Sequence, residues 1–341
     1  MSVNLLILNN KEMSELGAGS MEAVLHDVER SYALFDADDV FMPGKLVMPF
    51  GKTPDAEYTA GRINCMPGYV GGEYDLAGVK WIGSSPDNYT RGLPRASSTI
   101  ILNDRVTKLP VCVCDGTQVS AMRTGASGGV AMKYLARRNA KVITVCGAGA
   151  QGRTQLEAAL FVRPSIEKAY VYDLYFDRAE AYAKEMGAKF PQLAVVPVPQ
   201  EQLADAVRES DIVDTATLAT EPFVKAEWIK KGALVVNMSA YEVETGCVTM
   251  ADKVVVDFWE TVKHRLHSTV AVLAAQGKFR DEELYAEIGE IVGGRKPGRE
   301  SEDETIYFNA VGAGILDIAV AARCYHNAVA QGRGTTVPFW L

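Results

Sequence analysis

The first third of the chain alternates apolar and polar residues in short stretches, a pattern typical of half-buried β-strands. Before these stretches, apolar residues recur at helical spacing over Glu12–Phe35, which predicts a helix. Turns rich in Gly and Pro separate the stretches, as is usual between strands joined by loops. The predicted strands are Lys45–Phe50, Tyr58–Met66, Leu76–Ile82, Ser97–Asn103 and Leu109–Asp115.

The pattern changes after Asp115. Ala, Gly and Met at helical spacing over Gln118–Arg138 predict a connecting helix. From Lys141 onward, Val-rich strands alternate with helices, which predicts a parallel sheet covered on both faces. The predicted strands are residues 141–146, 169–173, 194–198, 211–217, 233–239 and 253–257, and the predicted helices are residues 153–162, 179–186 and 201–208.

This order predicts two domains, with a chain that leaves the first domain and later returns to it. The polar, turn-rich stretch Gly293–Thr305 predicts a linker, and Ile306–Ala330 predicts an apolar helix after it. We therefore predict an α/β protein. A Rossmann-type, doubly wound parallel sheet occupies 128–305, and an α+β substrate-binding and dimerisation domain is formed by 1–127 and 306–341.

Composition and charge exclude several classes of protein. The 341 residues are 48% hydrophobic and 23% charged, which is typical of a folded chain with one large core or two ordinary ones. The net charge of −8, without a basic run, argues against nucleic acid or an anionic membrane as partner. No apolar stretch is long enough to span a bilayer, and the N-terminus lacks the basic region of a signal peptide. The six cysteines form no CxxC pair, so we predict neither a metal site nor disulfides and expect a soluble, cytoplasmic protein.

A glycine-rich motif follows the first strand of the parallel region. Gly147, Gly149 and Gly152 match G-x-G-x-x-G between an apolar strand and a helix, which predicts a dinucleotide-binding turn with the pyrophosphate at the helix N-terminus. Asp173 ends the next strand, 21 residues after Gly152. A carboxylate there accepts hydrogen bonds from a ribose 2′-OH and repels a 2′-phosphate, so the cofactor is predicted to be NAD rather than NADP. Arg178 is the one residue that could contact the 2′-phosphate of NADP. The alternative is that Arg178 is a solvated helix residue.

Cations in the first region form a second signal. Lys80 lies on a predicted strand between Val79 and Trp81, where burial penalises its charge unless an anion is present. Arg123 lies near the start of the connecting helix, and its guanidinium geometry suits a carboxylate. Lys45, in a Pro-Gly-Lys turn, is the third candidate. From the residues alone, each is either a ligand contact or one half of a structural ion pair.

Several segments together are similar to the ornithine cyclodeaminase and μ-crystallin family. In chain order they are AGVKWIG, SAMRTGASGG, VCGAGAQG, DIVDTAT, NMSAYE and GAGILD, and the resemblance spans nearly the whole chain. That family contains cyclodeaminases, alanine and arginine dehydrogenases, cyclic ketimine reductases and an opine-like synthase. The resemblance implies the two-domain fold, NAD(P)-linked chemistry and dimers formed through the first domain.

The resemblance also implies roles for individual residues. Lys45 and Arg123 fall where family members hold the substrate α-carboxylate. Lys80 falls where the family has a lysine that binds carboxylate or moves a proton at the reacting nitrogen. The implied cofactor contacts besides the glycines and Asp173 are Ala150, Gln151, Thr215, Ala216 and Thr217, and Gly312 and Asp317 match the family's returning helix.

One segment departs from the family pattern. Cyclodeaminases have an Asp five residues after the Asn that corresponds to Asn237, and this chain has Glu242 there, with Tyr241 in place of a glycine. The longer side chain shifts the carboxylate by about 1 Å, which is enough to cost considerable rate. Glu242 is therefore either an adapted acid/base residue or a loop residue that faces solvent, and cyclodeamination is less favoured.

These observations predict an enzyme, an NAD-dependent oxidoreductase. It is expected to move a hydride between the nicotinamide and the α-carbon of an amino acid or its imine, as a dehydrogenase, a ketimine reductase or an opine-type synthase. The alternatives are a cyclodeaminase without net redox change and a non-catalytic binder like μ-crystallin. Its partners are expected to be a small amino acid, imine or keto acid and a second copy of the chain, because the strand-rich first domain has no obvious pair of covering helices. The tail Thr335–Leu341 is expected to pack on either its own chain or a neighbouring subunit.

Overall fold

The computed structural model describes residues 3–53, 56–238, 240–265 and 267–340, and the chain forms two compact units. The first unit consists of Met1–Arg123 together with Ala313–Leu341, and the second consists of Thr124–Gly312. No helix in the described part of the chain is both long and apolar enough to cross a membrane.

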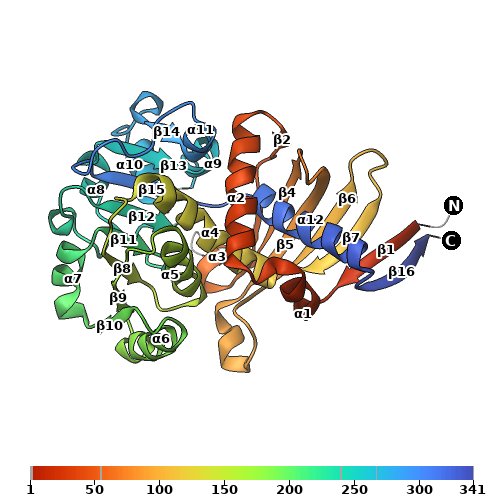
Figure 1. Cartoon of the computed structure of the whole chain (residues 1–341), viewed down its shortest axis with the longest axis horizontal. Helices are drawn as coiled ribbons and strands as arrows, with labels where there is room; N and C mark the ends of the chain where they lie inside the picture. Colours follow the sequence, from red (N-terminus) through yellow and green to blue (C-terminus); the bar gives the residue numbers. More distant parts are fainter. Residues whose placement is uncertain (1–2, 54–55, 239, 266, 341) are drawn as a thin grey trace. The chain divides into compact units, whose positions relative to one another are not determined.

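The first unit is built on one mixed sheet in the order β16-β1-β7-β6-β5-β4-β2, with β3 paired to β4. Its neighbouring strands are antiparallel, except for the parallel pair β1 and β7. Helix α12 packs against β4, β5 and β6 and against α2 (Figure 1). The strands are β1 Val3–Leu8, β2 Val40–Phe41, β3 Leu46–Pro49, β4 Arg62–Val70, β5 Leu76–Ser84, β6 Ala96–Asp104, β7 Pro110–Asp115 and β16 Thr335–Trp340. The helices are α1 Asn10–Met13, η1 Ser14–Ala18, α2 Met21–Asp36, α3 Ala56–Thr59, η2 Pro86–Arg91 and α12 Gly314–Gln331.

The single helix predicted over residues 12–35 is wrong. The chain breaks at Gly17, whose φ of +107° is a backbone conformation that favours glycine, and α2 begins after the N-cap Ser20. Arg323 of α12 donates hydrogen bonds to the carbonyl oxygens of Leu16 and Gly17 at this break. The C-terminal tail pairs with its own chain, as β16 alongside β1.

The second unit is a parallel sheet in the order β10-β9-β8-β11-β12-β15-β13-β14. The strand order reverses between β8 and β11, which is where doubly wound sheets bind ligands at the carboxyl ends of their strands. The strands are β8 Val142–Cys146, β9 Lys168–Tyr172, β10 Ala194–Val198, β11 Ile212–Thr215, β12 Leu234–Met238, β13 Lys253–Val256, β14 Ala286–Glu287 and β15 Ile306–Ala310. The helices are α4 Thr117–Leu135, which begins in the first unit, α5 Ala150–Val162, α6 Phe176–Lys189, η3 Gln200–Gln202, α7 Leu203–Glu209, η4 Ala226–Trp228, α8 Gly246–Thr249, α9 Trp259–Val262, α10 Thr269–Ala275, η5 Asp281–Glu283 and α11 Ile288–Val292.

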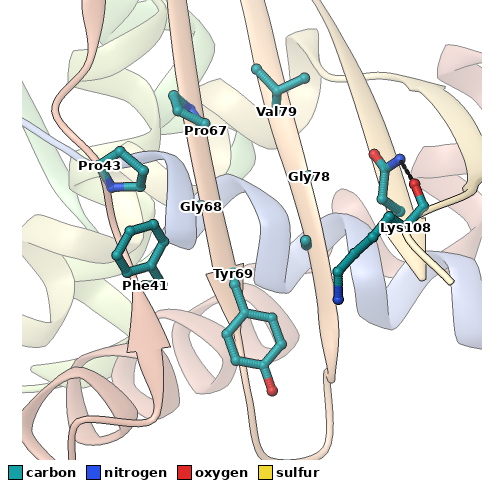
Figure 2. A pocket seen from close by; sticks show the side chains of 10 residues that line it. Phe41, Pro43, Pro67, Gly68, Tyr69, Gly78, Val79 and Lys108 are labelled. Carbon is teal, nitrogen blue, oxygen red and sulfur yellow. Dashed lines mark hydrogen bonds between the residues drawn. The ribbon is translucent and has the colours of Figure 1, made fainter. Parts of the chain in front are cut away.

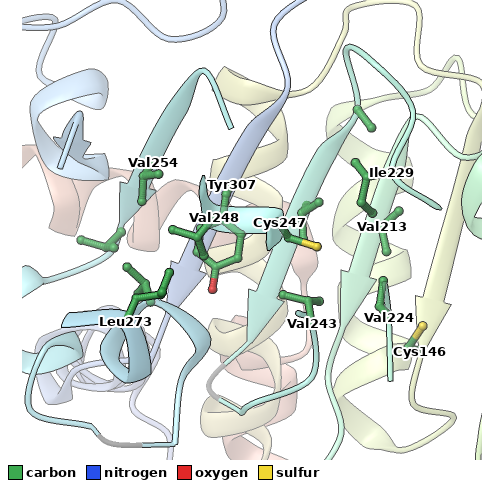
Figure 3. Packing of buried hydrophobic residues seen from close by; sticks show 14 of the residues in the cluster. Cys146, Val213, Val224, Ile229, Val243, Cys247, Val248, Val254, Leu273 and Tyr307 are labelled. Atoms are coloured by element: carbon green, nitrogen blue, oxygen red, sulfur yellow. The ribbon is translucent and has the colours of Figure 1, made fainter. Parts of the chain in front are cut away.

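Val-rich strands bury one face of this sheet in a continuous apolar cluster. Figure 3 shows Val213, Val254 and Tyr307 on strands β11, β13 and β15 of the sheet, in one cluster with Cys247 and Leu273 from the helices that cover them. Strands buried in this way have few polar positions, so each buried polar side chain in the sheet needs an explanation of its own.

The return to the first unit differs from the prediction. Ile306–Ala310 is strand β15, paired with β12 and β13 in the parallel sheet, rather than the start of a helix. The second unit therefore ends at residue 312 instead of 305. The stretch Gly293–Thr305 lies within that unit and is held in place, since Lys253 donates to the carbonyl oxygen of Gly298 at 2.7 Å and pairs with Glu300 at 2.7 Å.

Candidate functional site

Three charged side chains of the first unit form one buried cluster. The Lys80 Nζ lies 2.7 Å from Oδ2 of Asp317, and the Arg123 Nε donates to Oδ1 of the same carboxylate at 3.1 Å. Lys80 also donates to the Ser120 hydroxyl at 3.2 Å. Lys80 and Asp317 are 1% and 0% exposed, so both charges lie almost entirely outside bulk water. The structure brings together two of the predicted cations and adds a carboxylate between them.

Local sequence places each member of this cluster. On β5, Lys80 points to the face covered by α12, between the cross-strand neighbours Met66 and Ile100. On α4, Ser120 and Arg123 are three residues apart, so they share one face of the helix.

Helix α12 supplies the carboxylate from its first turn. A Cβ at Gly314 would lie 2.5 Å from the Met66 carbonyl oxygen, so only glycine lets the start of the helix approach β4 this closely. Asp317 follows in the first turn, where the positive end of the helix dipole stabilises a carboxylate.

The cluster has the electrostatics of an acid/base site. Burial and the neighbouring Arg123 charge lower the pKa of Lys80 from 10.5 to about 8, although the Asp317 carboxylate raises it. A lysine with a pKa near neutrality can both release and take up a proton during a reaction. With Lys80 protonated, two cations face one carboxylate, so a further carboxylate would balance the charge.

The backbone register places Lys45 near this cluster. Lys45 is half-buried and directly precedes Leu46, which pairs with Cys65 of β4. The next residue of β4, Met66, pairs with Lys80. Since neighbouring strands lie about 4.8 Å apart, the backbones of Lys45 and Lys80 are separated by roughly 10 Å. The carboxylate-binding role of Lys45 stays a prediction.

In the second unit, the glycine motif forms an open turn between β8 and α5. Gly147 has a φ of +115°, and a Cβ at Gly152 would lie 2.0 Å from the Gly147 carbonyl oxygen, so both positions require glycine. Beside Gly149, by contrast, a Cβ would meet nothing within 4 Å among the described atoms. Ala150 and Gln151 begin α5, whose N-cap Gly149 offers no side-chain acceptor to their amides. An open turn with free helix amides fits a pyrophosphate.

Asp173 lies beside this turn, where the ribose of a dinucleotide is expected. Its two carboxylate oxygens accept hydrogen bonds from the backbone N–H of Ala148 at 2.9 Å and of Tyr175 at 3.1 Å. These bonds fix the carboxylate against the glycine turn. Arg178 is exposed and stacks on the Tyr175 ring, with 4.5 Å between the guanidinium carbon and the ring centroid.

The loop after β11 is held by Glu242. This side chain is 0% exposed, so the alternative that it faces solvent is wrong. Its carboxylate accepts hydrogen bonds from the Thr215 hydroxyl at 2.9 Å, the Thr217 hydroxyl at 2.6 Å, the Thr217 N–H and the Asn237 amide at 2.8 Å. Burial raises the pKa of Glu242, and these donors oppose the rise. The carboxylate therefore fixes the conformation of Thr215, Ala216 and Thr217 at the point where the strand order reverses.

Comparison with known proteins places the chain in a family. The family model described as "Ornithine cyclodeaminase/mu-crystallin family" matches residues 9–332. This chain belongs to the ornithine cyclodeaminase/mu-crystallin family. Within the family, it is 34% identical over 338 residues to an N-((2S)-2-amino-2-carboxyethyl)-L-glutamate dehydrogenase of Staphylococcus aureus, with 99% of each chain covered.

Two solved structures of ornithine cyclodeaminase/mu-crystallin relatives confirm the predicted fold class. An archaeal alanine dehydrogenase dimer with bound NAD has a TM-score of 0.88 at 32% identity, covering 99% of this chain and 100% of its own. The Δ1-pyrroline-2-carboxylate reductase of Thermococcus litoralis, in complex with NADH and L-proline, has a TM-score of 0.88 at 35% identity, covering 97% and 100%. This chain accordingly has a Rossmann-like parallel-sheet domain and a second domain built on a mixed sheet.

Sequence reasoning missed several side chains that support the family site. It predicted no contact for Asp317, although an acidic residue in the otherwise apolar first half of this helix was a signal that a buried cation lay nearby. It also missed Arg153 and Tyr182. Arg153 donates to the carbonyl oxygens of Ala148 and Gly149, and Tyr182 donates to that of Gly152 at 2.9 Å. Together these two side chains occupy carbonyl oxygens of the glycine turn and hold its backbone in place.

Proposed function

We propose that this protein is an NAD-dependent oxidoreductase that transfers a hydride between the nicotinamide and the α-carbon of an amino acid or its imine. The buried Lys80–Asp317–Arg123 cluster carries this proposal, because two cations around one carboxylate suit a ligand that brings a second carboxylate. The three relatives support the reaction class. Their names describe a carboxyethyl-glutamate dehydrogenase, an alanine dehydrogenase and a pyrroline-2-carboxylate reductase, all of which act at a carbon–nitrogen bond beside a carboxylate.

Different residues have different roles in this reaction. Arg123, with Lys45, binds the substrate α-carboxylate and thereby orients the α-carbon. Lys80 gives a proton to the reacting nitrogen during reduction and takes it back during oxidation, since its pKa of about 8 suits both directions. When bound, the nicotinamide cofactor supplies or accepts the hydride. In reduction, the imine gains that hydride at carbon and the Lys80 proton at nitrogen.

The second unit supports NAD as the cofactor. The open turn at Gly149 and the start of α5 suit the pyrophosphate, and the loop Thr215–Thr217 lines the same end of the sheet. Asp173 places a carboxylate at the expected ribose position, which favours NADH over NADPH. Equal affinities of the two cofactors, measured by fluorescence titration, would contradict this preference, and Asp173→Ala is expected to narrow it.

The alternatives are less well supported. Cyclodeamination in this family uses a carboxylate that corresponds to Glu242, and here four neutral donors already occupy that carboxylate. A non-catalytic binder of apolar ligands would need neither Lys80 nor Arg123.

The test is a spectrophotometric assay at the nicotinamide absorbance band. One arm combines NAD with a panel of amino acids, and the other combines NADH with Δ1-pyrroline-2-carboxylate or with pyruvate and an amine. We expect net NADH formation or consumption in at least one arm, and a weaker response when NADPH replaces NADH. A cyclodeaminase would convert ornithine without net redox change, and a binder would give no turnover in either arm.

We further propose a homodimer. One relative is described as a dimer. The sheet face opposite α12 also carries a hollow of about 430 Å³ in the first unit, lined by side chains that include Phe41, Pro67, Tyr69 and Val79 (Figure 2). Trp81 points to the same face as Val79 and is 44% exposed, which adds to an apolar surface suited to a second copy. A mass of 37.0 kDa by light scattering at micromolar concentration would contradict the dimer.

A cytoplasmic location also remains a proposal. All six cysteines are free thiols, which is consistent with a reducing compartment. Cell fractionation that finds most of the protein in a periplasmic or secreted fraction would contradict a cytoplasmic location.

A further inference from the structure

Asp317 is an unusual residue for its position. It is the acidic residue in the first turn of α12, with buried Ile315, Leu316 and Ile318 on either side of it. A buried carboxylate is costly unless its charge is compensated. Each of its oxygens contacts a different cation, Oδ2 at Lys80 and Oδ1 at Arg123. One side chain therefore joins a residue from a central strand to a residue from α4.

A second buried carboxylate of the same unit provides a comparison. Asp27 of α2 is 1% exposed and pairs with Arg323 of α12 at 2.7 Å, while Tyr74 donates to its other oxygen at 3.0 Å. Asp27 thus links α12 to the neighbouring helix α2, and its role is structural. Asp317, by contrast, contacts Arg123, to which we assign binding of the substrate carboxylate, and Lys80, to which we assign proton transfer.

The geometry has a direct electrostatic consequence for Lys80. Two influences favour the neutral amine, namely burial and the positive charge of Arg123, and the Asp317 carboxylate opposes both by favouring the ammonium. If the negative charge of Asp317 were removed, the two remaining influences would act on Lys80 without opposition. Lys80 would then be largely neutral at the pH at which it should donate a proton.

We propose that Asp317 is a positioning residue for this reaction, whose carboxylate fixes Lys80 and Arg123 in one place and determines how firmly Lys80 holds its proton. The inference rests on the proposed function only in its claim that Lys80 transfers this proton to or from the substrate nitrogen. The effect of Asp317 on Lys80 is a property of the folded protein and can be measured without substrate.

Charge balance describes how the cluster would respond to a ligand. Protonation of Lys80 raises the summed charge of Lys80, Arg123 and Asp317 from zero to +1. A carboxylate ligand is attracted to that added positive charge and therefore binds better to the protonated cluster. Asp317 keeps the protonated form available before a ligand binds.

The experiment measures the proton affinity of Lys80 by NMR. The full-length protein is labelled with 13C at the lysine Cε, the Lys80 signal is assigned by its loss in Lys80→Arg, and its chemical shift is followed against pH. In the unaltered protein we expect a midpoint near pH 8. In Asp317→Asn, which keeps the size of the side chain and removes its charge, the midpoint should fall by about one pH unit or more.

Two further variants complete the test. Asp317→Glu retains the charge and should restore most of the Lys80 midpoint, and it serves as the second variant if Asp317→Asn does not fold. Asp27→Asn is the matched control, because it removes a buried carboxylate that pairs with a cation of α12 elsewhere in the unit. In folded Asp27→Asn the Lys80 midpoint should not change.

An unchanged Lys80 midpoint in folded Asp317→Asn would overturn the inference. The inference would also be overturned if the Lys80 midpoint fell as far in Asp317→Glu as in Asp317→Asn. An equal fall of the Lys80 midpoint in Asp27→Asn would overturn it as well. Failure of the proposed function has a different signature, in which no amino acid or imine is converted while the Lys80 midpoint still depends on Asp317. If turnover is found, the acidic limb of the kcat/KM profile for oxidation, which reports the free enzyme, should move with the NMR midpoint in each variant.

Discussion

Asp317 in the first unit and Glu242 in the second are both fully buried carboxylates, but their partners differ in kind. Asp317 contacts two cations, Lys80 and Arg123, whereas the donors to Glu242 that we describe are neutral hydroxyls, an amide and a backbone N–H. A carboxylate between two cations leaves a positive charge that a ligand can balance. A carboxylate held by neutral donors has no cation beside it and fixes the conformation of a loop. The kind of partner, more than burial alone, distinguishes the proposed reacting site from a carboxylate that holds a loop.

The most severe way to test this comparison is Lys80→Met, which removes the proposed proton donor and keeps an apolar side chain of similar length. Proton transfer by a positioned side chain contributes roughly 10²- to 10⁴-fold, so we expect kcat to fall by about that factor even at saturating substrate. Steady-state kinetics and melting temperature are to be measured on the same preparation. A normal kcat in the folded variant would end the assignment of Lys80 as proton donor.

Arg123→Lys tests the geometry of carboxylate binding, because it keeps the positive charge and loses the guanidinium fork. A charge-assisted hydrogen bond contributes on the order of 1.5–3 kcal/mol, so losing one predicts a roughly ten- to hundredfold fall in kcat/KM. The loss should appear mainly in KM for the carboxylate substrate. If Arg123 were only a structural partner of Asp317, stability would fall while the surviving protein kept its kinetic constants.

Glu242→Gln should have a smaller effect on turnover and a clear effect on the loop Thr215–Thr217, to which we assign a cofactor contact. Glutamine replaces one acceptor oxygen with a donor, so at least one of Thr215, Thr217 and Asn237 loses its partner, at a cost of about 1–3 kcal/mol. We expect a lower melting temperature and several-fold weaker NADH binding, with kcat at saturation within a few-fold. A loss of kcat as large as that of Lys80→Met would show that Glu242 takes part in acid/base chemistry.

Asp214→Asn should have the smallest effect on activity, and it adds a third kind of buried carboxylate to the comparison. Asp214 of β11 is 0% exposed, and neither of its oxygens has a hydrogen-bond partner among the residues described. Burial raises its pKa well above 3.8, and the Glu242 charge raises it further. The charge of Asp214 in turn contributes to the raised pKa values of Tyr182 and Cys146.

The sign of the Asp214 effect follows from linkage. A carboxyl whose pKa is higher in the folded protein contributes stability that is complete below its unfolded pKa, near 4, and is lost as pH rises through the folded value. Each unit of that rise corresponds to about 1.4 kcal/mol. Asp214→Asn should therefore gain stability relative to the unaltered protein between pH 4 and neutrality, as measured by denaturant unfolding. A difference that does not depend on pH would contradict this account.

The local parts of the structure could be predicted well from sequence. The glycine turn, Asp173 and the strands around them lie within a short stretch of chain, and their spacing alone predicts a dinucleotide site there. The parallel order of the second unit followed from the alternation of strands and helices. The error at Ile306–Ala310 has a simple cause, since a five-residue apolar run does not distinguish a buried strand from a helix.

By itself, the sequence of this protein determined most of its helices and strands, its family and the residue types of its candidate site, because these depend on periodicity and on spacings of a few residues. Only the tertiary structure decided the partners of the buried charges. Arg123 and Asp317 are 194 residues apart, and Lys80 meets them through a sheet register that no local pattern encodes. A hydrophobic pattern states which side chains are buried, whereas the folded chain alone determines which charges share the same low-dielectric space.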